Sequence, residues 1–154
     1  MKKIIVITLL SIIANIATAQ NNKLIQDVNV GAIVATVAST TFSGGSQPFE
    51  VGYGLSASVV FVTKKTATNF TYSFGGNSVG MLNAYFLPKN WDIYVVGSKS
   101  LNSDGKYVGI GIEKMEKIGN VKFFEFIELG TGFQGKPILS FGLLLNPSWS
   151  LKKK

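Results

Sequence analysis

A chain of 154 residues has room for one domain, at roughly 150 residues per domain. Hydrophobic residues make up 46% of it and charged residues only 15%, which excludes a disordered or charge-solvated chain. Histidine and cysteine are absent, and all 15 positive side chains are lysines. The composition therefore excludes imidazole bases, thiolate nucleophiles, histidine or cysteine metal sites and disulfides.

The first nineteen residues have the layout of a secretory signal peptide. Lys2 and Lys3 precede an apolar run over 4–13. The small residues Ala17 and Ala19 then precede an expected cleavage site between Ala19 and Gln20. The apolar run is too short for a good membrane-spanning helix. We expect residues 1–19 to be removed after export, which leaves 20–154 as a single domain.

The remaining chain alternates with a period of two residues. Between Val51 and Phe61 the odd positions are apolar, whereas the even positions are mostly glycine and serine. A helix would scatter both sets around its circumference, so the pattern predicts strands. Turn residues separate the apolar stretches. The predicted strands are 28–38, 51–62, 66–75, 78–87, 91–98, 106–116, 120–129 and 137–146.

Evenly spaced short strands favour an all-β barrel or sandwich. The second face of these strands carries Gly, Ser, Thr and Asn, where a soluble barrel would present Lys, Glu and Asp to water. Small neutral side chains suit the interior of a narrow barrel, and the apolar face would then meet lipid. In hydrocarbon an open sheet edge is not tolerated. We therefore predict a closed, antiparallel, up-and-down barrel of about eight strands.

The predicted connections are longer at one end of this barrel than at the other. Residues 39–50, 99–105 and 130–136 form the long connections, and all three fall at the same end. Long outward loops and short inward turns are typical of outer-membrane barrels. The longest loop, 39–50, is the expected surface for a partner such as another envelope protein.

With this pattern over 28–146, the chain resembles the small eight-stranded barrels of bacterial outer membranes. The resemblance implies an outer-membrane location and membrane lipid as a partner. From the architecture we expect a structural, adhesion or accessory-subunit role. It departs at the C-terminus, where such barrels end on an aromatic residue and here Trp149 is followed by 150–154. The acyltransferases and deacylases among such barrels depend on a histidine near a serine. No catalytic residue can therefore be carried over to this chain.

Three carboxylates are the polar candidates for the barrel interior: Asp92, Glu113 and Glu125. Placing Phe124 and Phe126 outward turns Glu125 inward, and counting from the turn at 117–120 puts Glu113 and Glu125 at similar heights. Two close carboxylates could act as acid and base. The alternative, which we favour, is that they bond hydroxyls or a lysine inside a plugged lumen. We thus predict no enzyme, no cofactor and no metal site.

Two further hypotheses stay open from the sequence. A soluble periplasmic or secreted lipocalin-like barrel would turn the same apolar face inward and bind a small hydrophobic ligand. An open pore is a weaker version of the membrane hypothesis. Nucleic-acid binding is disfavoured, because the chain lacks arginine and its lysines are scattered.

Overall fold

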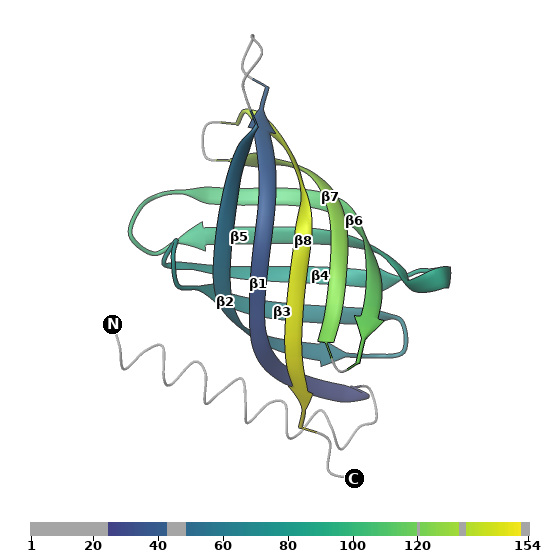
Figure 1. Ribbon diagram of the computed structural model, residues 1–154. Coiled ribbons are helices and arrows are strands. Elements are labelled where there is room, and N and C mark those ends of the chain that lie inside the picture. Colours follow the sequence, from purple (N-terminus) through teal and green to yellow (C-terminus); the bar gives the residue numbers. More distant parts are fainter. Residues whose placement is uncertain (1–24, 43–48, 120, 133–134, 152–154) are drawn as a thin grey trace.

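The fold is a closed eight-stranded barrel (Figure 1). The computed structural model describes residues 25–42, 49–119, 121–132 and 135–151. The predicted signal peptide, the tip of the predicted 39–50 loop and the three C-terminal lysines lie outside the described residues. The strands are β1 (Asp27–Thr41), β2 (Glu50–Val62), β3 (Thr66–Ser73), β4 (Ser78–Phe86), β5 (Trp91–Ser100), β6 (Lys106–Ile118), β7 (Val121–Gly132) and β8 (Pro137–Ser150). A single 3₁₀ turn, η1 (Pro88–Asn90), lies between β4 and β5.

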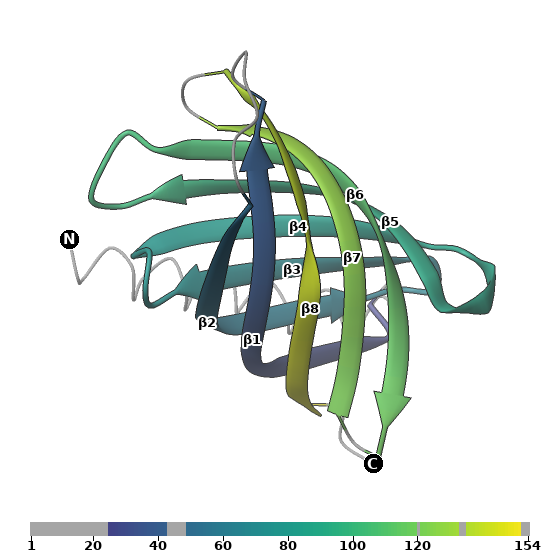
Figure 2. The same ribbon diagram turned by 45° about the horizontal axis from the view of Figure 1, so that its top comes forward.

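Each strand pairs antiparallel with its neighbours in sequence, and β8 pairs with β1 to close the barrel. Figure 2 shows β1 lying between β2 and β8 at this closure. The predicted up-and-down topology is therefore confirmed. Following paired residues once around the barrel from Asn29 leads through Val60, Asn69, Leu82, Val96, Gly109, Gly130 and Ile138 to Thr41. This stagger along β1 is an even number of residues, so inward and outward faces stay consistent all the way round.

The two ends of the barrel differ in what they carry. The end that we call the terminal end holds the connections 63–65, 87–90 and 119–120, together with the first and last described residues. The other, the loop end, holds the connections 42–49, 74–77, 101–105 and 133–136. All predicted strands are present, but several extend further than predicted, so the loops are shorter. Ser39, Lys99 and Gly130, predicted in loops, belong to β1, β5 and β7.

Closure brings the backbones of β1 and β8 unusually close at two glycines. A Cβ atom on Gly142 would collide with the carbonyl oxygen of Thr36, and one on Gly31 would lie 2.9 Å from Cα of Ser148. The ladder between the two strands is interrupted at Ala32 and Ile33. Only residues without a side chain fit such an approach. The sequence thus places glycine where the barrel seam requires it.

Candidate functional site

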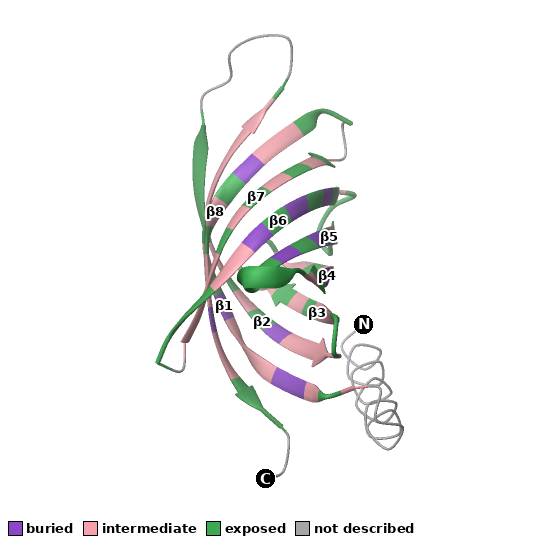
Figure 3. Cartoon of the chain, turned by 90° about the vertical axis from the view of Figure 1, so that its right-hand side faces the viewer, coloured by how far each residue is buried: buried purple, intermediate pink, exposed green. Residues whose placement is uncertain are grey.

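The outer wall carries a continuous apolar surface, which we call the apolar belt. Its side chains alternate with inward-facing residues along every strand, and their exposed fractions run from 37% for Ile112 to 83% for Tyr53. Figure 3 shows this alternation of buried and exposed segments along the strands. The large exposed members are Val34, Val51, Tyr53, Leu55, Phe70, Tyr72, Val79, Met81, Tyr85, Trp91, Ile93, Val95, Val108, Ile110, Ile112, Ile127, Leu129, Phe141 and Leu143. Every strand contributes at least one of these side chains, so the belt encircles the barrel.

Exposed aromatic residues gather near both ends of the barrel. Toward the loop end lie Tyr53, Tyr72 and Phe74, and the rings of the last two meet edge to face with centroids 5.3 Å apart. Toward the terminal end lie Tyr85, Trp91 and Trp149. The last strand extends to Ser150, so Trp149 is a strand residue that shares the outward face of Phe141 and Leu143.

Polar groups on the outer wall are few and placed in two ways. Toward the terminal end of β3 and β4, the Thr68 hydroxyl donates to Oδ1 of Asn83 at 2.7 Å, so these two cross-strand neighbours bond each other. Charged outward-facing strand residues all lie within five residues of a strand end: Lys99, Lys106, Lys114, Glu116 and Glu125. A band without charge therefore separates the two ends.

The interior of the barrel contains a polar cluster centred on Glu128. The Tyr107 hydroxyl donates to Oε1 of Glu128, and the Tyr94 hydroxyl lies against the same carboxylate. Ser140 is the cross-strand neighbour of Glu128 and hydrogen-bonds Tyr107. Four strands, β5 to β8, thus contribute to one hydrogen-bonded cluster, which we call the tyrosine–glutamate cluster.

Inward-facing glycines make room for the two tyrosine rings. A Cβ atom on Gly111 would collide with the Tyr94 ring, and one on Gly130 would collide with the Tyr107 ring. A Cβ on Gly109 would come within 2.9 Å of the Tyr107 hydroxyl oxygen. The rings therefore lie flat against the inner wall where the strands carry no side chain. Gly109, Gly111 and Gly130 are therefore inner-wall glycines.

Asp92 and Glu113 also lie in the interior, next to this cluster. They are direct cross-strand neighbours, and their relative exposures are 7% and 5%. Glu113 faces Glu128 as well as Asp92. Among the described residues, no lysine forms an ion pair with any of these three carboxylates. Like charges directly opposite one another destabilise a sheet, and no ion pair with a described lysine offsets that repulsion between Asp92 and Glu113.

The prediction that Glu125 faces the lumen is wrong. Glu125 is exposed on the outer wall, opposite Lys114 in the register, and Glu113 lies opposite Phe126 instead. The two glutamates are therefore on opposite faces of the wall and cannot form the acid–base pair considered above. The physical reason is that Glu125 and Glu128 are three positions apart on β7, so their side chains point to opposite faces of the strand. Because the mid-strand Glu128 faces inward, Glu125, which is nearer the strand end, faces outward.

Sequence reasoning missed three members of the interior: Tyr94, Tyr107 and Glu128. A signal for them was present in the glycines, because Gly111 is the cross-strand neighbour of both Tyr94 and Glu128. A large residue beside a glycine on the same face indicates that the side chain folds over the gap.

Replacing Tyr107 by phenylalanine tests the tyrosine–glutamate cluster. The change removes a hydroxyl donor from a carboxylate inside the barrel, so we expect a loss of about 1.5–3 kcal/mol in the free energy of unfolding. The measurement is urea unfolding followed by tryptophan fluorescence. Tyr53→Phe is the matched control, because Tyr53 is exposed on the outer wall. Equal effects of the two substitutions would contradict the cluster.

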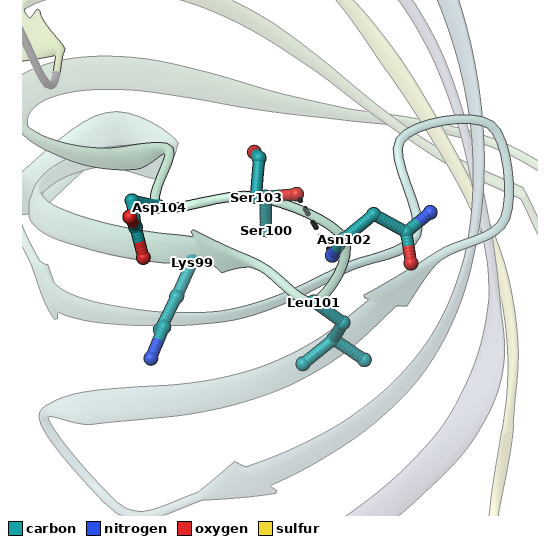
Figure 4. A pocket seen from close by; sticks show the side chains of 6 residues that line it. All are labelled: Lys99, Ser100, Leu101, Asn102, Ser103 and Asp104. Atoms are coloured by element: carbon teal, nitrogen blue, oxygen red, sulfur yellow. Dashed lines mark hydrogen bonds between the residues drawn. The ribbon is translucent and has the colours of Figure 1, made fainter.

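The loop end carries a shallow concavity formed by six consecutive residues, 99–104, of the β5–β6 hairpin (Figure 4). The amide of Asn102 donates to Oγ of Ser100 at 3.3 Å and shapes this turn. Asn77 joins it to the β3–β4 turn, because its carbonyl oxygen accepts from the amide of Leu101 at 2.8 Å. A concavity made by one open hairpin lacks the enclosed apolar lining of a small-molecule site.

Within the described ranges, no group of three or more acidic side chains is placed to hold a metal ion. In the same part of the chain, no helix is both long and apolar enough to cross a membrane. The sequence matches no protein-family model, and no curated protein is significantly similar to it.

Proposed function

We propose that this protein is an integral outer-membrane β-barrel without enzymatic activity, acting as a structural, adhesion or accessory-subunit protein. The observation that carries the proposal is the apolar belt. Contiguous apolar patches on soluble monomers rarely exceed a few hundred Å², whereas this belt involves every strand. A bilayer is the environment in which such a surface is stable.

Three further features support the proposal. Seven of the eight strands have 9 to 15 residues and β3 has 8, whereas a tilted strand needs about 9–11 to cross the hydrocarbon core. Exposed aromatic residues lie near both ends, as in the interfacial girdles of such barrels. The loop end has the longest connection and the terminal end the shortest. By the same rule, the loop end faces outward from the cell and the terminal end faces the periplasm.

The interior favours a plugged barrel over a pore. The two tyrosine rings lie against the inner wall and bond Glu128 and Ser140 across four neighbouring strands. A lipocalin-like binder would need the opposite arrangement, with apolar side chains lining the cavity and polar ones outside. Function would then reside at the loop end, where the exposed Phe42 and Phe49 border the connection between β1 and β2.

Fractionation of cells that express the protein tests the proposal. We expect the protein in the outer-membrane fraction, released only by detergent, with gel mobility that shifts when the sample is boiled. Recovery from the periplasmic supernatant without detergent would overturn the membrane assignment and favour the lipocalin-like alternative.

A further inference from the structure

Lysines gather around the terminal end of the barrel. Six of the described lysines lie there: Lys64, Lys65, Lys89, Lys114, Lys117 and Lys122. The exposed or half-buried carboxylates at that end are Asp27, Glu116 and Glu125. The loop end carries three lysines and two carboxylates: Lys99, Lys106, Lys136, Glu50 and Asp104. Among the exposed and half-buried groups, the terminal end is therefore the more basic of the two; the buried Asp92 and Glu113 near that end face the interior.

The carboxylates at the terminal end are already engaged. Glu116 pairs with Lys114 at 2.7 Å, and Glu125 lies opposite the same lysine in the register. Asp27 accepts from Oγ of Ser150 at 2.5 Å. None of the other five lysines forms an ion pair with a described residue. We call these five, Lys64, Lys65, Lys89, Lys117 and Lys122, the basic collar.

Turn geometry holds three members of the collar at the tips of the terminal end. The Thr63 hydroxyl accepts from the amides of Lys65 at 3.2 Å and Thr66 at 3.0 Å, which fixes a tight turn with Lys64 and Lys65 exposed. Lys89 lies in η1 with φ of 62°, and the amide of Leu87 donates to the carbonyl of Trp91 at 2.7 Å across its base. The backbone therefore presents these ammonium groups to solvent.

The remaining two members face each other across the β6–β7 hairpin. Lys117 and Lys122 are direct cross-strand partners on the inward-facing side of the hairpin, at the mouth of the barrel, an arrangement that repulsion disfavours in the absence of an anion. At Lys64, Lys65 and Lys89 the collar borders the apolar belt, because Tyr85 and Trp91 lie at the same end of their strands. In a bilayer, groups at this height meet the phosphates of the lipid headgroups.

We propose that the basic collar binds the phosphates of anionic phospholipids in the leaflet on the periplasmic side. This inference rests on the proposed function, because it requires the belt to be embedded. A juxtamembrane lysine strengthens binding to an anionic surface by about fivefold. The collar would hold the terminal end at the headgroup level and set the orientation of the barrel.

Folding into vesicles of two compositions tests the collar. Urea-denatured purified protein is diluted into vesicles of phosphatidylcholine alone or mixed with phosphatidylglycerol, and folding is followed by the heat-shifted gel band. At low salt we expect folding to be at least about tenfold faster with the anionic lipid. About 1 M salt, where the Debye length is about 3 Å, should abolish the difference.

Two triple variants with the same net charge locate the effect. K64Q/K65Q/K89Q should lose most of the enhancement by anionic lipid, whereas K99Q/K106Q/K136Q, at the loop end, should keep it. Equal folding rates of the unmodified protein in both vesicles, or equal losses in both variants, would overturn the collar proposal. Failure to fold into either kind of vesicle would instead overturn the proposed membrane location.

Discussion

Replacing Ile110 by lysine is expected to destabilise the protein in a bilayer by about 2–4 kcal/mol. Ile110 is 52% exposed near the middle of the outward face of β6, within the apolar belt. In a membrane its side chain contacts acyl chains, and a charged group there loses its hydration. In water the same substitution would replace an exposed apolar side chain by a soluble one at little cost.

Ile118→Lys is the matched control for this substitution. Ile118 has the same side chain, lies on the same strand and the same face, and is 68% exposed, but it ends β6 at the terminal end. There the cost should fall to about 0–1 kcal/mol. Urea unfolding from phospholipid vesicles measures both values. Equal costs at the two positions would show that the belt is not in hydrocarbon.

Gly142→Ala is expected to cost up to about 3 kcal/mol and to lower the folded fraction. The added methyl group would meet the carbonyl oxygen of Thr36 on β1 and come within 3.0 Å of Cε1 of Phe126. Backbone atoms cannot move aside without disturbing the ladder that joins β8 to β1. Because this ladder closes the barrel, its disturbance exposes two strand edges.

Gly54→Ala tests whether the close approach, rather than glycine itself, matters. Gly54 lies on β2, the other neighbour of β1, and an added Cβ would stand 3.9 Å from Cβ of Ala35. That is ordinary contact, so we expect a neutral effect or a gain of about 0.4–1 kcal/mol from the less flexible unfolded chain. Both values come from urea midpoints of the detergent-solubilised protein. A loss at Gly54 as large as that at Gly142 would contradict the account of the seam.

Strand existence and closure could be predicted because the period of two is strong where one face is apolar and the other is small and polar. From Val51 to Phe61 only one assignment of faces is reasonable, and in the structure that face is exposed from Val51 to Ala57 and half-buried at Val59 and Phe61. On β4, Asn83 lies on the same face as Met81 and Tyr85, and the hydrogen bond that it accepts from Thr68 explains how the outer wall accommodates it.

The interior could be predicted less well, because β7 is apolar on both faces. With Phe124 and Phe126 on one side and Ile127 and Leu129 on the other, hydrophobicity does not decide which face turns inward. Which face of β7 turns inward depends on a contact between strands, the hydrogen bond from Tyr107 to Glu128. These two residues are 21 positions apart in the sequence. The lengths of β1 and β8 were also underestimated, because the last residues of β1 are held by the first residues of β8, and the last residues of β8 by the first residues of β1, rather than by their own pattern.

The most direct test of the central claim, that the outward face contacts lipid, uses the absence of cysteine in the chain. Single-cysteine variants Ile110→Cys and Ser103→Cys report the belt and the exposed loop end separately. Folded protein in intact outer membranes is treated with a membrane-impermeant maleimide, and labelling is measured by mass. We predict rapid labelling at position 103 and none at position 110 until the protein is unfolded. Equal labelling of both positions in the folded protein would contradict the account.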